Sequence, residues 1–181
     1  FVLSAAAHIE HLVVCLRSLQ WGLRESVRIV GVTKASLEKE SPAGEALPTE
    51  ISAGQVTGLV GPDGAGKTTL LRLIAGLLLI DDGTLRVCGY DPKTHAAPLH
   101  RVVAYMPQRF GLYEDLSVIE NLELYADLRS VIGTERDEAF ARLLSFTGLE
   151  PFTGRLAGAL SGGMKQKLGL ACALVKGPRL L

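Results

Sequence analysis

The chain has 181 residues, of which 48% are hydrophobic and 21% charged, so it is expected to fold around a sizeable core rather than to be disordered. Its 19 basic residues equal its 19 acidic ones, and no net charge attracts it to nucleic acid or to an anionic membrane surface. Its cysteines, Cys15, Cys88 and Cys172, are too far apart for a closely spaced metal or dithiol motif, which favours a reducing cytosol.

Residues 1–26 are interpreted as a separate N-terminal segment, within which residues 1–25 predict one amphipathic helix. Its apolar positions, at nearly helical spacing, are Ile9, Leu12, Val13, Leu16, Leu19 and Leu23. Packing against another surface explains this face better than binding to a membrane, which favours more Lys and Arg. A signal peptide is rejected because the segment has no basic leader and polar residues interrupt its apolar run.

Short β-branched segments separated by turn residues predict strands in the next part of the chain. These strands are predicted over residues 27–33, 55–60, 84–88 and 102–106. The second strand leads through glycines into a helix predicted over residues 68–79. The longest apolar stretch, residues 70–80, is too short to cross a hydrocarbon core of ~30 Å as a helix, so no membrane-spanning segment is expected.

The C-terminal part is predicted to be mainly helical, which gives an α/β chain with a helical insert. Ser117, followed three residues later by Glu120, is a capping-box pattern that begins the first helix. A second helix is predicted from Thr134 to Gly148. A third begins after Ser161 and ends at residues 177–178, where Gly is followed by Pro.

Residues 61–69, GPDGAGKTT, match the phosphate-loop pattern G-x-x-x-x-G-K-[ST] between a predicted strand and a predicted helix. Glycines let the backbone turn with positive φ and approach phosphate oxygens without an obstructing Cβ. The helix dipole favours an anion here by up to ~1 kcal/mol at exposed sites.

Side chains complete the predicted phosphate site. Lys67 supplies a positive charge for the β- and γ-phosphates, Thr68 an oxygen for Mg²⁺, and Thr69 is expected nearer the α-phosphate. A chance match in a chain of this length is on the order of one in a hundred or less. The pattern therefore predicts a site for ATP, or a close relative, with Mg²⁺.

A second motif, LSGGMKQ, occupies residues 160–166. Ser161 is a natural N-cap, and the two glycines after it leave an open helix N-terminus that can accept phosphate oxygens from outside the chain. On these residues alone, an ordinary capped helix stays an alternative.

Taken together, the two motifs resemble those of the ATP-binding subunits of ABC transporters. GPDGAGKTT is similar to their Walker A loop and LSGGMKQ to their signature motif, while residues 105–108, YMPQ, resemble the Q-loop. Residues 111–129, GLYEDLSVIENLELYADLR, resemble the helical subdomain of bacterial drug-efflux exporters. The resemblance covers residues 27–181. It implies an α/β P-loop NTPase core with an antiparallel β subdomain and a helical subdomain at about residues 110–165.

The resemblance also implies roles for individual residues. ATP and Mg²⁺ are expected to be held by Gly61, Pro62, Asp63, Gly64, Ala65, Gly66, Lys67, Thr68 and Thr69. Gln108 is implied as the catalytic residue near the metal and the attacking water, so Thr68 and Gln108 are the metal candidates. Ser161, Gly162 and Gly163 are implied to close over the γ-phosphate held by a second such domain, in a head-to-tail dimer.

Two departures from the family pattern affect these expectations. Residues 33–37 contain no aromatic side chain where the family stacks adenine. Leu180 and Leu181 resemble the beginning of the Walker B strand, and the Mg²⁺-binding Asp and catalytic Glu that follow it in the family are not present. The chain is therefore expected to be a fragment, incomplete at its C-terminus, and to hydrolyse ATP very slowly by itself.

The resemblance implies that the intact parent is an ATPase at the cytoplasmic face of the cell membrane. It is expected to power export of a drug-like substrate through separate membrane-spanning subunits, with no nucleic-acid partner. Two alternatives stay open. One is a soluble ABC ATPase acting on nucleic acid or ribosomes, although no coiled-coil insertion or basic arm is visible. The other is an inactive, truncated nucleotide-binding fragment with an unpaired sheet edge.

Overall fold

The computed structural model describes residues 12–14, 25–33, 49–54, 56–60, 62–108 and 111–181. The chain divides into two compact units, Phe1–His100 and Arg101–Leu181. The division expected after residue 26 and the helical subdomain expected at about residues 110–165 stay predictions.

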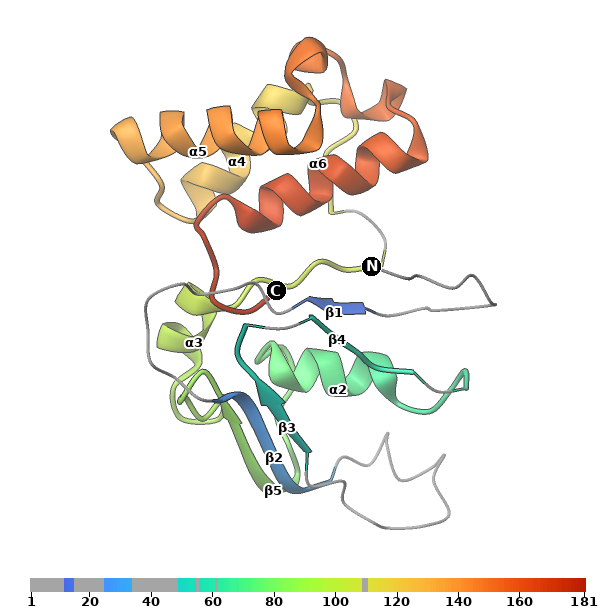
Figure 1. Cartoon of the computed structure of the whole chain (residues 1–181), viewed down its shortest axis with the longest axis vertical. Coiled ribbons are helices and arrows are strands. Elements are labelled where there is room, and N and C mark those ends of the chain that lie inside the picture. Colours follow the sequence, from blue (N-terminus) through green and yellow to red (C-terminus); the bar gives the residue numbers. More distant parts are fainter. Residues whose placement is uncertain (1–11, 15–24, 34–48, 55, 61, 109–110) are drawn as a thin grey trace. The chain divides into compact units, whose positions relative to one another are not determined.

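Antiparallel strands form the sheets of the first unit (Figure 1). The described strands are β1 (Leu12–Val14), β2 (Glu25–Thr33), β3 (Thr49–Ser52), β4 (Val56–Gly58) and β5 (Asp82–Val87). β1 pairs with β4, whereas β2 lies between β3 and β5. Val27 of β2 is opposite Val87 of β5, and both are fully buried, so this pair anchors the three-stranded sheet in its core.

The helix predicted over residues 1–25 is wrong at Leu12–Val14, which form β1, and at Glu25, which begins β2. Val13 and Val14 are β-branched, and such side chains fit a strand better than a helix. Pairing with β4 supplies the backbone partners that a strand needs. The rest of that helix prediction lies outside the described residues.

The strand predictions fare differently along the chain. Those over residues 27–33 and 84–88 are confirmed in β2 and β5, apart from Cys88, and part of the one over residues 55–60 is confirmed as β4. The strand predicted over residues 102–106 is wrong, because Val102 ends α3 (Ala96–Val102) and Val103 forms only an isolated parallel bridge to Leu180. A strand requires consecutive paired residues, and Val103 with Leu180 is a single pair.

Helix α2 (Lys67–Ile74) directly follows the predicted phosphate loop and ends earlier than the predicted residue 79. The chain leaves the helix at Gly76, whose φ of 69° is left-handed and costs glycine little. The amides of Leu77 and Leu78 then both donate to the carbonyl of Arg72, at 2.8 and 3.3 Å. These bonds satisfy the helix end, so the apolar residues that follow are not helical.

The second unit has a helical core. Its longer helices are α4 (Val118–Leu128), α5 (Gly133–Thr147) and α6 (Gly162–Leu174), and two short 3₁₀ turns, η1 (Glu150–Phe152) and η2 (Ala157–Ala159), lie between α5 and α6. All three longer helices contribute buried residues to one apolar cluster, which includes Leu122, Ala126, Leu143, Leu144, Leu168, Ala171 and Cys172.

The predicted beginnings of α4 and α6 and the predicted end of α5 are confirmed, whereas α6 ends at Leu174, earlier than the predicted residues 177–178. Ser117 and Glu120 form a complete capping box at the beginning of α4. Gly148, with φ 68°, ends α5, and Ser161 caps α6. None of the helices in the part of the chain that the structure describes combines the length and the apolar character needed to cross a membrane.

Candidate functional site

The predicted phosphate loop leads into α2 in the first unit. Gly61 lies outside the described residues, whereas Pro62, Asp63 and Ala65 are exposed. Gly64 and Gly66 have φ values of 83° and 77°. A residue with a Cβ pays a penalty of roughly 1–2 kcal/mol in this left-handed region, so the path of the loop favours glycine at both positions.

The N-terminus of α2 begins without a side-chain cap. Its N-cap residue is Gly66, and neither a side-chain hydrogen bond to the cap nor an acidic residue in the first turn occurs within the described chain. Intrahelical bonding begins with the amide of Leu70, which donates to the carbonyl of Gly66 at 2.9 Å. Amides in the first turn of a helix have no acceptor within that helix, and the dipole at this end favours an anion.

Lys67 brings a positive charge to the same place. Only 8% of the residue is exposed, and its Nζ donates to the backbone carbonyl of Pro62 at 2.6 Å. The side chain therefore folds back across the loop instead of extending into solvent. An ammonium group held against a backbone carbonyl of the loop fits the charge and the hydrogen-bonding capacity of a polyphosphate.

Thr68 and Thr69 occupy the first turn of α2, and both are half-buried. Mg²⁺ prefers hard oxygen ligands and is bound in such sites by few protein groups together with phosphate oxygens. The hydroxyl of Thr68 is of the right chemical type, so this end of α2 fits a magnesium nucleotide.

A second helix N-terminus of interest lies in the second unit. The Oγ of Ser161 accepts a hydrogen bond from the amide of Met164 at 3.3 Å, which caps α6. Gly162 and Gly163 are exposed, and a Cβ built on either would meet no described atom within 4 Å. The described fold does not require glycine here, and the missing side chains leave the turn open to a molecule approaching from outside.

Gln108 is exposed in the second unit and lies outside the helices and strands. The phosphate loop belongs to the first unit, whereas Gln108 and the Ser161 turn belong to the second. A site that joins the three motifs is therefore a prediction.

Sequence reasoning missed a buried amide beside these motifs. Asn121 of α4 is fully buried, and its Nδ2 donates to the carbonyls of Tyr113, Leu116 and Ser117 at 3.0–3.2 Å. Its Oδ1 accepts from the amide of Tyr113 at 3.0 Å. A polar residue at a buried position of an amphipathic helix was the available signal. Asn121 fixes residues 111–117, which follow the Q-loop segment, onto α4.

The same segment is also bound to the stretch that precedes the signature motif. The amide of Ala157 donates to the carbonyl of Leu116 at 2.8 Å, and that of Gly158 donates to the carbonyl of Glu114 at 2.9 Å. A Cβ on Gly158 would lie 3.1 Å from this carbonyl oxygen, so glycine allows the close approach. Residues 111–117 are thus held on two sides within the second unit.

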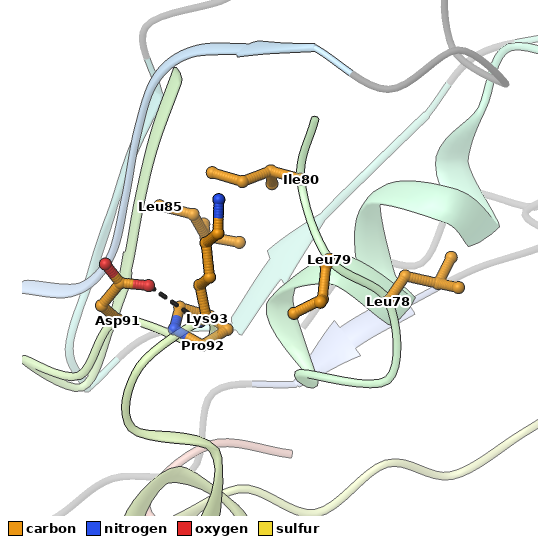
Figure 2. A pocket seen from close by; sticks show the side chains of 7 residues that line it. All are labelled: Leu78, Leu79, Ile80, Leu85, Asp91, Pro92 and Lys93. Atoms are coloured by element: carbon orange, nitrogen blue, oxygen red, sulfur yellow. Dashed lines mark hydrogen bonds between the residues drawn. The ribbon is translucent and has the colours of Figure 1, made fainter. Parts of the chain in front are cut away.

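A shallow hollow elsewhere in the first unit is a different feature (Figure 2). It lies between the segment that follows α2 and the turn after β5, and it is lined by Leu78, Leu79, Ile80, Leu85, Asp91, Pro92 and Lys93. The carboxylate of Asp91 accepts from the amide of Lys93 at 2.8 Å, which closes that turn. None of the described residues of the predicted phosphate loop lines the hollow, so the hollow and that loop are separate features of the first unit.

Comparison with known proteins identifies the family. The ABC transporter family profile matches residues 45–181. The chain is 61% identical over 155 residues to the probable multidrug ABC transporter ATP-binding protein YbhF of Escherichia coli K12, a match covering 86% of this chain and 27% of YbhF. It is 41% identical over 136 residues to the Nod factor export ATP-binding protein I of Cupriavidus metallidurans, covering 75% of this chain and 45% of that protein.

A solved structure described as an ATP-binding subunit of an ABC transporter has the same fold. It superposes with a TM-score of 0.63 at 25% identity, over 84% of this chain and 62% of the other. The chain thus spans 27% of the length of YbhF and 45% of the length of the Nod factor export protein.

The chain belongs to the ABC transporter family, within which it is an ATP-binding domain. The ATP-binding domains of this family are ATPases. The family and the α/β ABC ATPase fold predicted from the three motifs are therefore confirmed.

Proposed function

We propose that this chain binds ATP with Mg²⁺ through residues 61–69, and that the intact protein hydrolyses it to power export of a substrate across a membrane. The observation that carries the proposal is the N-terminus of α2, where the N-cap is Gly66 and no side-chain cap hydrogen bond is made. Gly64 and Gly66 shape the loop in front of it, and the ammonium of Lys67 lies within that loop.

Each residue then has a chemical task. The amides of the loop and the first turn of α2 donate to phosphate oxygens, and Lys67 exchanges the carbonyl of Pro62 for a phosphate oxygen. Bound Mg²⁺ would offset part of the negative charge of the phosphates, and Thr68 and Gln108 are the candidate protein ligands of this ion. Gln108 also orients the attacking water.

The turn formed by Ser161, Gly162 and Gly163 serves a second copy of the domain. Its exposure and the open space around both glycines support contact with a phosphate held elsewhere. ATP that bridges two domains stabilises their dimer by mass action, and hydrolysis removes this stabilisation.

The partners and the cargo follow from the relatives. YbhF is named as a probable multidrug transporter component and the second relative as a Nod factor export component, so export through membrane-spanning subunits is the favoured direction. We place the protein at the cytoplasmic face of the membrane, with a drug-like substrate.

Nucleotide titration of the intact protein tests the core of this proposal. If phosphate recognition dominates, AMP, which lacks the β- and γ-phosphates, is expected to bind at least about 100-fold more weakly than MgATP, since each charged hydrogen bond contributes about 1.5–3 kcal/mol. Equal affinity for AMP and ATP would contradict a phosphate-centred site.

A purification experiment tests the transport role. The intact protein, isolated from detergent-solubilised membranes, is expected to carry a membrane-spanning partner with it. Recovery with ribosomes or nucleic acid instead would favour a soluble ABC ATPase.

A further inference from the structure

We propose that Glu114 and Lys165 form a positioning pair. The pair holds the signature turn, which is Ser161, Gly162 and Gly163 at the beginning of α6, in a fixed place against residues 111–117. The inference rests on the proposed function, because it assigns the pair to the step in which Ser161, Gly162 and Gly163 meet the nucleotide of a second copy.

The geometry of the pair is direct. The Nζ of Lys165 lies 2.6 Å from Oε1 of Glu114, across 51 positions of sequence. The Lys165 side chain is 20% exposed and that of Glu114 is 65% exposed, so the lysine is largely covered while the carboxylate faces solvent. The two residues join the segment that follows the Q-loop to the helix that carries the signature motif.

Lys165 lies where its position affects the turn. Its backbone amide donates to the carbonyl of Ser161 at 2.8 Å, which is the bond that begins helical pairing in α6. A displacement of Lys165 therefore moves the capping serine and the two glycines that follow it. The ion pair acts on the same short stretch of backbone that presents amides to a ligand.

The backbone around Glu114 is held in place by several hydrogen bonds. Its own carbonyl accepts from Gly158, and the neighbouring Tyr113 exchanges hydrogen bonds in both directions with buried Asn121. The hydroxyl of Tyr125 donates to the carbonyl of Gly111 at the other end of the segment. Residues 111–117 are fixed by these bonds, so the pair transmits their position to α6.

The energetic expectation follows from exposure. Ion pairs near the surface contribute little to folding stability, so loss of this pair is expected to leave the fold intact. Hydrogen bonds to a phosphate depend strongly on placement, and a shift of about 1 Å in a catalytic arrangement lowers rates by as much as about 100-fold. The effect is therefore expected in nucleotide-driven association and turnover.

Another role for Lys165 predicts a different outcome. If its ammonium were itself a phosphate ligand, removal of Glu114 would release it toward the nucleotide and would not harm activity. The positioning role predicts that both residues are needed and that neither matters without the other.

The experiment uses the intact protein and the variants Glu114→Gln, Lys165→Gln, the double variant, and Lys165→Arg. Asp115→Asn and Lys167→Gln are matched controls, since Asp115 is an exposed acidic residue next to Glu114 and Lys167 an exposed lysine of the same helix as Lys165. The measurements are MgATP affinity, MgATP-driven dimerisation by analytical ultracentrifugation, kcat and KM for ATP, and the melting temperature.

Each single Gln variant is expected to weaken dimerisation and lower kcat by about 5- to 20-fold, within the range for displaced catalytic groups, with KM and MgATP affinity within about twofold of wild type. The double variant is expected to lose no more than the worse single one, and Lys165→Arg to retain activity. The inference is overturned if Lys165→Gln alone loses activity, or if both singles match the controls.

The same data separate this inference from the proposed function. If the wild-type protein binds MgATP and dimerises while the Gln variants behave like the controls, only the positioning pair is wrong. If the wild-type protein neither binds MgATP nor associates in its presence, the proposed function fails and the pair fails with it.

Discussion

The ammonium of Lys67 donates a hydrogen bond to the carbonyl of Pro62, 2.6 Å away, so the phosphate loop is crossed by one of its own side chains. A nucleotide that enters the loop must replace this carbonyl with a better acceptor. A phosphate oxygen is such an acceptor because it carries charge.

Replacement of this lysine tests the site. Lys67→Ala is expected to raise the dissociation constant for MgATP by about 10- to 100-fold, because it removes a charge-assisted hydrogen bond of about 1.5–3 kcal/mol. Titration with a fluorescent ATP analogue measures the effect, and Lys93→Ala, at an exposed lysine of the same unit, is the control. Unchanged affinity would show that the loop does not bind the phosphates.

Gly66 offers a test through backbone strain. Its φ of 77° is unfavourable for alanine, so Gly66→Ala is expected to cost roughly 1–2 kcal/mol of stability and to weaken MgATP binding. The control is Gly154→Ala, because a Cβ there meets no described atom within 4 Å and φ is not positive. Chemical denaturation and nucleotide titration report the two effects. A Gly66→Ala protein that matched the Gly154→Ala protein in both would argue against the loop geometry.

Asn121 is expected to be essential to the stability of the second unit. Asn121→Leu leaves the amide of Tyr113 and the carbonyl of Ser117 without their side-chain partner, at a cost of about 2–4 kcal/mol for several lost buried hydrogen bonds. Urea unfolding measures this loss. Glu123→Gln, an exposed position on the same helix, is expected to change stability by less than about 0.5 kcal/mol. A comparable value for both variants would refute the network.

The capping box of α4 predicts a pH dependence. Two hydrogen bonds with Ser117 lower the pKa of the Glu120 carboxyl. The bond with the Ser117 side chain is the larger cause, and the bond that the Ser117 backbone amide donates to Glu120 is the next. The folded pKa therefore lies below the unfolded one, and the stabilisation is present above the unfolded pKa and lost as pH falls through the folded pKa. The melting-temperature difference between wild type and Glu120→Gln should shrink on acidification. Glu123→Gln should show no such trend, and a constant difference for Glu120→Gln would contradict the capping role.

The buried thiol of Cys172 is expected to be inert in the folded protein. Burial raises the pKa of Cys172 to about 12, which leaves almost no thiolate at neutral pH. Iodoacetamide at about pH 8, followed by peptide mass spectrometry, is expected to leave this cysteine unmodified until denaturant is added. Rapid labelling of the native protein would show that the α4–α6 core opens.

Local chemistry explains which parts of the fold could be predicted from sequence. Ser117 with Glu120, Gly148 and Ser161 gave correct helix ends, because a cap depends on residues within one turn. The helix predicted over residues 1–25 was wrong at β1, because three residues of strand are decided by their partner β4 and not by their own periodicity. β3 was missed since its sequence, TEIS, has little apolar character and gains its structure from pairing with β2.

The candidate site divides in the same way. The phosphate loop and the signature turn are contiguous motifs and are visible in the sequence. Asn121 and the pair of Glu114 with Lys165 act across the fold, and no local pattern joins positions 51 residues apart. Their contribution requires the packing of α4 and α6.

Helices α4 and α6 both begin with a serine, yet their third residues differ in a way that decides their chemistry. In α4 this residue is Glu120, and its carboxylate returns to the amide of Ser117, so the helix is sealed by a negative charge of its own chain. In α6 it is Met164, and no acidic residue occupies the first turn. An incoming anion would be repelled by the Glu120 carboxylate at the N-terminus of α4 and attracted by the dipole at the N-terminus of α6. We expect Met164→Glu to place a carboxylate in the first turn of α6 and to weaken the binding of a phosphate that comes from outside the chain.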